Sequence, residues 1–408
     1  MFINKIANNL IVKQLCIWTI IAFLFLYVFS IPAFSGRPVW YLISYALMAG
    51  LGAVTIFYTL IYTKVRINKW FILPLLFILF AGIGTIIYSH NFRMWLTLFL
   101  MFLTMIIFYY AFIAIVNKRI IFKILVLAFL LFAFYFSFVY RYPILHLQLT
   151  SARLGTYFDN VNTIGFYFAI GFSLSLYIGV FFEKKYELLY ILASLLFFAL
   201  GLFTGSRSFL VAVAFVLVFI LFFKLRNHLL IFVIALACMV ALYFILLKIP
   251  KLAFLKEQFD RMVYTLFGIG NSKVDGSTIQ RMMWPRYAFY LGAKNMLIGY
   301  GCGGFSIYSG VGTYAHNNFA EIMCNFGIIG FILFNLCYFV PVLLCKGKRR
   351  DLIMVILLFV VYFSRSLFGV IYYTKEAYLL FAILFFVSKD YTLSLFKRNY
   401  DEFSEVNI

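Results

Sequence analysis

The chain has 408 residues, of which 66% are hydrophobic, 22% aromatic and only 12% charged. So few polar side chains cannot cover the exterior of a water-soluble protein, and the composition therefore indicates a polytopic membrane protein. The formal net charge of +21 would suggest a nucleic-acid partner in a soluble chain. Here Lys and Arg cluster in short loops between apolar runs, as membrane topology requires, so no nucleic acid is expected as a partner.

The apolar runs predict an all-α integral membrane bundle of about twelve transmembrane helices. A helical span needs about 20 apolar residues. The candidate spans are residues 15–34, 38–62, 70–88, 94–116, 120–140, 161–182, 187–204, 208–223, 229–247, 319–345, 351–370 and 376–388. The first is interpreted as a retained span and not a signal peptide, because no small-residue cleavage site follows it.

The positions of the cations predict the topology. If the N-terminus is cytoplasmic, every short inner loop is basic, as the positive-inside rule demands. The inner cations are Lys64, Arg66, Lys69, Lys118, Arg119, Lys123, Lys184, Lys185, Lys224, Arg226, Lys346, Lys348, Arg349 and Arg350. Both termini are then cytoplasmic, and the chain divides into an N-terminal bundle (1–247), a large extracytoplasmic loop (248–318) and C-terminal spans with a cytoplasmic tail (319–408).

Several arginines fall on the outer side, where the positive-inside rule does not account for them. An arginine at membrane depth costs about 2.5 to 3.5 kcal/mol, and its planar fork suits phosphate oxygens. Taken singly, each of these arginines could anchor a lipid headgroup; as a set, they favour an anion site on the outer face. They are Arg37, Arg93, Arg141, Arg153, Arg207, Arg281, Arg286 and Arg365.

A tight hairpin, Thr204 to Ser208, joins two spans with almost no loop and fixes Arg207 at the outer mouth of the bundle. Arg153, upstream of the sixth span, can face the same mouth. Both are candidates for binding an anionic substrate.

Two helices are predicted inside the large loop. From Leu252 to residue 266, apolar residues recur every three or four positions, which predicts an amphipathic helix on the outer membrane surface. A capping box predicts a second helix from about Thr278, with Arg281 in its first turn. Pro285 should kink or end this helix, so Arg281, Trp284 and Arg286 are expected in an irregular, partly exposed region.

The loop then reaches a glycine-rich run, Gly299 to Phe305. It is not a dinucleotide loop, because no strand precedes it. Its glycines predict either tight packing of a re-entrant backbone or a close approach to substrate.

His316 follows this run directly before the tenth span. Asn318 with Glu321 three residues later predicts a cap-like start to the helix. A helix N-terminus disfavours the imidazolium, so His316 should be neutral and able to accept a proton near pH 7.

Together these features resemble the bacterial O-antigen polymerase and O-antigen ligase superfamily over approximately residues 150 to 335. The resemblance rests on Thr204-Gly205-Ser206-Arg207, the Arg281 to Trp284 segment, the Gly299 to Phe305 run, and Ala315-His316-Asn317 followed by Glu321 and Gly327-Ile328-Ile329-Gly330. It implies metal-independent glycosyl transfer on the outer face of the bacterial cytoplasmic membrane, from a glycan on undecaprenyl diphosphate. It further implies that Arg207 and Arg281 hold the diphosphate and that His316 activates the acceptor hydroxyl.

The expected site therefore has three catalytic residues, which are His316, Arg281 and Arg207. The expected substrate-binding residues are Arg153, Arg286, Tyr314, Asn317, Glu321 and Arg365. Neither a metal nor a cofactor is expected, because the chain has no Asp-x-Asp pair and its six cysteines form no metal-like pair.

Three functions remain open. A polymerase joins repeat units by moving the growing chain onto a lipid-linked acceptor, and it is favoured by family analogy because the chain is so rich in Phe, Ile and Tyr. A ligase would move the chain to lipid A core. A flippase or other transporter is less favoured, because the two halves of the chain show no repeat. The partners implied are the undecaprenyl-diphosphate-linked oligosaccharide, membrane lipid, a chain-length regulator and a flippase of the same pathway.

Overall fold

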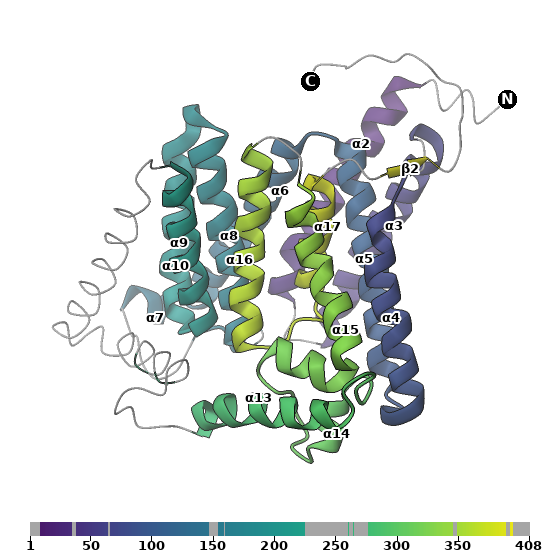
Figure 1. Ribbon diagram of the computed structural model, residues 1–408. Helices are drawn as coiled ribbons and strands as arrows, with labels where there is room; N and C mark the ends of the chain where they lie inside the picture. The colour runs from purple at the N-terminus through teal and green to yellow at the C-terminus, as the bar shows by residue number, and fades with distance from the viewer. Residues whose placement is uncertain are drawn as a thin grey trace.

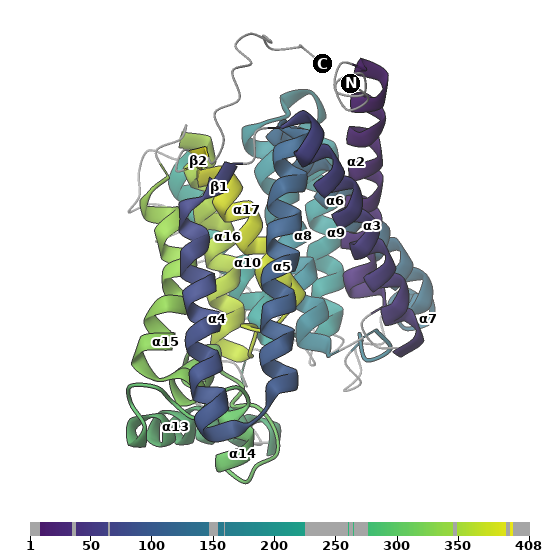
Figure 2. The ribbon, with the colours of Figure 1, turned by 90° about the vertical axis from the view of Figure 1, so that its right-hand side faces the viewer.

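The computed structural model describes residues 9–34, 38–63, 66–146, 154–158, 160–224, 260, 264, 276–345, 349–388 and 392–394. Long helices run side by side through most of this part of the chain (Figures 1 and 2). The helices are α2 (Leu10–Ala33), α3 (Pro38–Tyr62), α4 (Ile72–Gly84), α5 (Phe92–Ile115), α6 (Lys118–Val139), α7 (Arg141–Leu145), α8 (Val161–Phe181), α9 (Glu187–Thr204), α10 (Arg207–Lys224), α13 (Gly276–Lys294), α14 (Gly304–Tyr308), α15 (Asn318–Leu343), α16 (Arg349–Phe368) and α17 (Lys375–Ser388). Short helical turns are η1 (Lys69–Phe71), η2 (Thr85–Ser89) and η3 (Lys184–Tyr186), and the strands are β1 (Arg66–Asn68) and β2 (Thr392–Ser394).

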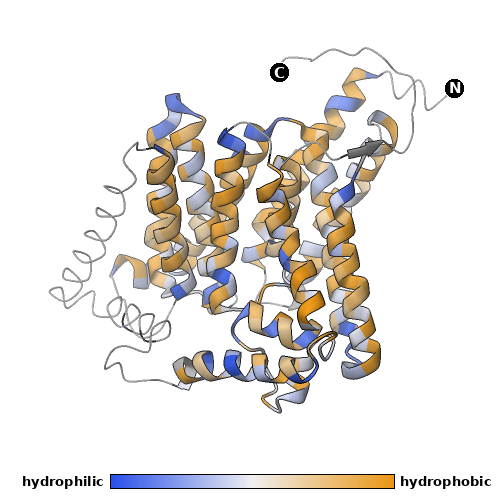
Figure 3. Ribbon diagram, in the orientation of Figure 1, coloured by the Kyte–Doolittle hydropathy of each residue, from blue (hydrophilic) through white to orange (hydrophobic). Residues whose placement is uncertain are grey.

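The prediction of a polytopic all-α membrane protein is confirmed. Ten helices of the described residues are long and apolar enough to cross a membrane, and each coincides with a predicted span. The predicted span 376–388 is α17, whose 14 residues are fewer than a full crossing needs. The predicted span 229–247 lies outside the described residues. Hydrophobic residues dominate the long helices (Figure 3).

Asparagine marks where several spans begin. The side chains of Asn9, Asn91, Asn117, Asn160 and Asn317 each accept a backbone N–H from the first turn of the helix that follows. An N-terminal cap of this kind satisfies a donor that has no partner inside the helix. Within lipid every backbone group must be bonded internally, so these caps define where the apolar helices start.

One end of the bundle carries basic residues and the ion pairs that hold it together. Lys118 at the start of α6 lies 2.8 Å from Asp351 of α16, and Lys123 lies 2.8 Å from Glu183 after α8. Beside them β1 pairs antiparallel with β2, with Arg66 opposite Ser394. The two three-residue strands are the exception to the helical architecture.

The other end of the bundle is covered by α13 and α14, which lie across it (Figures 1 and 2). Here α15 is broken at Gly327, whose φ of 60° and ψ of −166° are not helical. The break leaves carbonyls of α15 free to accept hydrogen bonds from the glycine-rich loop, Gly299 to Phe305. Tyr300 N donates to Cys324 O (3.0 Å) and Gly301 N to Asn325 O (2.6 Å).

The glycines of this loop are required by close packing. A Cβ on Gly299 would lie 2.4 Å from Phe326 N, and one on Gly301 would lie 2.6 Å from the backbone of Gly84 at the end of α4. Both residues also have positive φ, which favours glycine. The predicted tight packing of this segment is therefore confirmed, and the loop is wedged between α4 and the break in α15.

Candidate active site

The start of α15 fixes the loop that carries His316. Asn317 is the N-cap, accepting the Ala320 N–H at 3.0 Å, and its Nδ2 donates to Leu367 O at 3.2 Å. The prediction that Asn318 forms the cap is wrong by one residue. Asn318 is instead fully buried, and its Oδ1 accepts the N–H groups of Ile371 and Tyr372 from the α16–α17 turn.

His316 lies between two aromatic rings. Trp284 of α13 stacks on the imidazole, with centroids 5.2 Å apart and an interplanar angle of 12°. Tyr314 meets it edge-on, with centroids 4.4 Å apart. The backbone of His316 is left-handed, with φ of 57°, which is uncommon for a residue other than glycine. Strained backbone of this kind often occurs at functional sites.

Burial and charge together keep this imidazole neutral. Burial, followed by the nearby Arg281 and Arg365, lowers the pKa of His316 to about 4. The imidazolium is disfavoured both by loss of water and by two like charges. A neutral His316 was predicted from the helix terminus; the direction agrees, but burial and the arginines are the causes.

Arg281 and Trp284 are both carried by α13. A kink or an end was predicted at Pro285, but the helix runs from Gly276 to Lys294 with Pro285 inside it. An end at Pro285 and an irregular region around these residues are therefore wrong predictions, whereas their partial exposure is confirmed. Proline removes one intrahelical hydrogen bond, and Arg281, whose carbonyl loses that bond, is only partly buried. Since residues three apart share a helix face, Arg281 and Trp284 point to the same neighbours.

Arg365 comes from α16 at the same end of the bundle. It is 7% exposed, and its guanidinium lies against Gly369, where there is no room for a Cβ. The pKa of Tyr373 is raised by burial and by the nearby Glu321 and Tyr314, and the nearby Arg365 partly opposes this shift. Tyr373, a residue that sequence reasoning did not select, therefore belongs to the same group of side chains.

Glu321 and Asn325 lie one and two turns into α15, beneath His316. Glu321 is 2% exposed, and its Oε2 accepts the Ala315 N–H at 2.5 Å. Asn325 Nδ2 donates to Glu321 Oε1 at 3.5 Å and to the Tyr372 hydroxyl at 3.0 Å. Phe305 N donates to Asn325 Oδ1 at 2.7 Å. These buried polar groups connect the His316 loop to α14 and to the α16–α17 turn.

Arg207 occupies the predicted hairpin. α9 ends at Thr204, Gly205 adopts a left-handed conformation with φ of 57°, and α10 begins at Arg207. Arg207 is 4% exposed, and α10 packs against α16, which carries Arg365. Arg207 therefore lies at the same end of the bundle as His316. The residues described above as interacting with His316 come instead from α13, α16 and the loop of His316 itself.

The remaining predicted residues are placed differently. Arg286 is exposed on α13, about 140° around the helix from Arg281. Arg153 and the predicted amphipathic helix from Leu252 lie outside the described residues, apart from Asp260 and Tyr264, which are helical.

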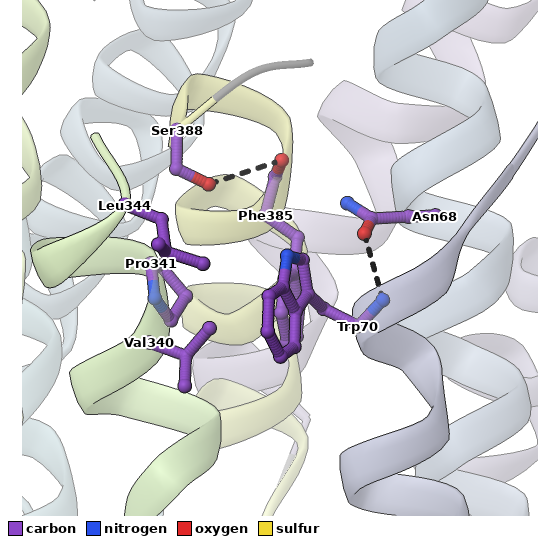
Figure 4. A pocket seen from close by; sticks show the side chains of 7 residues that line it. All are labelled: Asn68, Trp70, Val340, Pro341, Leu344, Phe385 and Ser388. Carbon is purple, nitrogen blue, oxygen red and sulfur yellow. Dashed lines mark hydrogen bonds between the residues drawn. The ribbon is translucent and has the colours of Figure 1, made fainter. Parts of the chain in front are cut away.

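A small recess lies at the basic end of the bundle, away from His316 (Figure 4). It is lined by Asn68, Trp70, Val340, Pro341, Leu344, Phe385 and Ser388, and it has room for about one water molecule, 10 Å³. This recess is too small to hold a substrate.

The arrangement around His316 suits proton transfer next to an anion. A neutral imidazole can accept a proton, and Arg281 and Arg365 are close enough to affect its ionisation. Guanidinium groups bind phosphate through paired hydrogen bonds. A phosphate ester held by these arginines would lie beside a base.

Comparison with known proteins finds one family that matches this part of the chain. Residues 191–335 match the family described as O-antigen ligase. No curated protein matches the chain. The ten apolar helices and this family together indicate a multi-pass inner membrane protein. The matched residues include Arg207, α13 and His316, so the segment that carries the candidate site is similar to the O-antigen polymerase and ligase superfamily, as its motifs predicted.

Proposed function

We propose that the protein is a polysaccharide polymerase. It joins oligosaccharide repeat units by transferring the growing chain from undecaprenyl diphosphate to a lipid-linked acceptor. The observation that carries this proposal is His316 held between Trp284 and Tyr314, with Arg281 and Arg365 nearby, at the end of the bundle covered by α13. The family match supports the wider class of polymerase or ligase.

In the proposed reaction, His316 takes the proton from the acceptor hydroxyl as its oxygen attacks the anomeric carbon of the donor glycan. The bond from that carbon to the phosphate oxygen breaks, and undecaprenyl diphosphate leaves with the bonding electron pair. Arg281, Arg365 and Arg207 stabilise the negative charge that develops on the diphosphate, as cationic clamps do in other phosphate-leaving reactions. No metal ion is required for this charge balance.

Polymerase and ligase differ in the acceptor and share the donor. The preference for polymerase rests on the resemblance and on the unusual aromatic content, 54 Phe and 30 Tyr. Deletion of the gene followed by analysis of surface polysaccharide tests the choice. Single repeat units on the cell surface are expected for a polymerase, whereas long chains retained on the carrier lipid would identify a ligase.

The proposed reaction takes place on the outer face of the membrane. The basic end of the bundle, with Lys118, Lys123 and Arg349, is assigned to the cytoplasm by the positive-inside rule. The end covered by α13 then faces outward, where the lipid-linked glycan is available, and both termini are cytoplasmic.

This orientation predicts the labelling of two exposed positions. A cysteine replacing Ile307, which is 51% exposed on α14, should react in intact cells with a membrane-impermeant maleimide. A cysteine replacing the exposed Lys185 should react only after the membrane is permeabilised. The wild-type chain controls for reaction of the native cysteines. The reverse pattern of labelling would reject the proposed site on the outer face.

A further inference from the structure

Glu321 is placed to act on the protein backbone. Its carboxylate is almost completely buried, and its Oε2 accepts the N–H of Ala315 at 2.5 Å. A hydrogen bond to a carboxylate is among the stronger ones in proteins. The peptide group that it holds, between Tyr314 and Ala315, lies one residue before His316.

His316 needs such support because its conformation is intrinsically unfavourable. Its φ of 57° lies in the left-handed region, which a residue with a side chain adopts only where its surroundings impose it. Glu321 holds the chain before His316, and the Asn317 cap holds it afterwards. With both sides fixed, the imidazole is directed between Trp284 and Tyr314.

The carboxylate of Glu321 is itself held in place. Asn325 donates to its other oxygen while binding the Tyr372 hydroxyl and the Phe305 N–H. Because all three contacts of Asn325 are to buried groups, its amide cannot turn over without losing hydrogen bonds. The position of Glu321 is therefore coupled to α14 and to the α16–α17 turn.

We infer that Glu321 is a positioning residue, whose carboxylate holds the Tyr314–Ala315 peptide so that the imidazole of His316 faces the reacting groups. This replaces the expectation that Glu321 binds substrate. The inference rests on the proposed function, because it takes His316 to be the base.

Two substitutions separate the reach of the side chain from its charge. Glu321→Gln keeps the reach and an acceptor oxygen for Ala315 N–H, but it replaces the oxygen that accepts from Asn325 Nδ2 with an NH2 group. Because the contact with Ala315 N–H remains, kcat is expected to stay within about tenfold of the wild type. Glu321→Asp keeps the charge but is one methylene shorter. It should lower kcat by about 100-fold, as a displacement of about 1 Å does for a catalytic group, with little change in KM.

The control is a second buried amide on the same helix. Asn335 is 7% exposed, and its Nδ2 donates to Phe331 O, in its own helix. Asn335→Ala should leave kcat unchanged, and abundance in the membrane fraction should be equal for all variants. If Glu321→Asp does not accumulate, Asn325→Ser, which removes the donor to Glu321 Oε1, is expected to lower kcat in the same direction by a smaller factor.

The pH profile provides a readout that a purely structural role would not move. The titratable and charged groups near His316 are Arg281 of α13, Arg365 of α16 and Tyr314 of its own loop. Tyr373 of the α16–α17 turn interacts with Tyr314 and Arg365, and Glu321 lies behind the loop. If Glu321→Asp frees the loop, the imidazole gains water, and the acid limb of kcat/KM should shift to higher pH. Glu321→Gln should leave that limb in place.

The outcomes distinguish this inference from the proposed function. If Glu321→Gln is as inactive as Glu321→Asp and neither moves the acid limb, Glu321 acts on substrate or as a base and the positioning role is overturned. Full activity in Glu321→Asp and Asn325→Ser overturns it as well. Normal polymer formation by His316→Asn would instead overturn the proposed function, whatever the Glu321 variants show.

Discussion

His316→Asn and His316→Gln are expected to lose about 100-fold to 10,000-fold in rate, the usual contribution of a general base. Both should accumulate undecaprenyl-linked substrate at unchanged protein abundance. His316→Asn separates the loss of the imidazole from a change in the backbone better than His316→Gln does, because Asn adopts left-handed φ more readily than most residues. It should preserve the backbone at φ of 57° while removing the imidazole. Polymer formation from purified lipid-linked repeat units measures the effect.

His90 offers a matched control for this substitution. It also has a positive φ, 53°, and it also directly precedes the N-cap asparagine of a long helix at the same end of the bundle, but its side chain is exposed. His90→Asn should therefore polymerise at the wild-type rate. Normal polymerisation by His316→Asn would reduce His316 to a packing residue, and abolition of the wild-type reaction by a chelator would contradict the proposed metal-free chemistry.

The pH dependence of kcat/KM and of kcat should report the ionisation of His316. Burial and two arginines lower the pKa of His316 to about 4, so the free enzyme stays active as pH falls below 6.5 and loses kcat/KM only near pH 4. A bound diphosphate offsets the charge of Arg281 and Arg365 and so raises the pKa of the imidazole. The acid limb of kcat, which reports the substrate complex, should thus lie at higher pH than that of kcat/KM.

The spans could be predicted from sequence because lipid imposes a simple rule on the chain. Each crossing must be helical and apolar for about 20 residues, so the apolar runs along the sequence located ten of the helices. The same rule located α17 but does not explain it, because its 14 residues are fewer than a full crossing needs. Its buried residues pack against α5, α15 and α16, and such contacts are not visible in a hydropathy pattern.

The candidate site could be predicted in part. The motifs identified His316 and Arg281, but they gave no reason to pair His316 with Trp284, since 32 positions separate them and only the fold of α13 across the bundle joins them. The predicted kink or end at Pro285 led to the expectation of an irregular region, which left the neighbours of Trp284 open. The observed helix places Trp284 three residues after Arg281, on the same face.

The α15 network shows a second limit of sequence reasoning. Asn317, Asn318, Glu321 and Asn325 look like ordinary helix-start residues, and the cap was predicted one residue late. Their actual partners are Leu367, Ile371, Tyr372, Ala315 and Phe305. Because all of these partners except Ala315 come from α14, α16 or the α16–α17 turn, a capping rule that considers only neighbouring residues cannot find them.

Arg281→Lys is expected to lower kcat/KM by about 10-fold to 100-fold while the protein inserts normally. Lysine keeps the positive charge but replaces a planar fork of donors with a single ammonium, so it cannot bind two phosphate oxygens side by side. The loss of one hydrogen bond to a charged partner, about 1.5 to 3 kcal/mol, gives this range. Arg365→Lys and Arg207→Lys should behave in the same way if all three arginines contact the diphosphate.

An arginine at the same end of the bundle serves as the control for these variants. Arg141 is exposed at the start of α7, where its Nη1 donates to Phe138 O, and Arg141→Lys should keep full activity. Donor binding, measured with undecaprenyl diphosphate, should weaken in Arg281→Lys but not in His316→Asn, because only the former removes a phosphate contact. Wild-type activity in Arg281→Lys, Arg365→Lys and Arg207→Lys would instead assign these arginines to topology or lipid anchoring. Positive charge alone, which lysine retains, is sufficient for both roles.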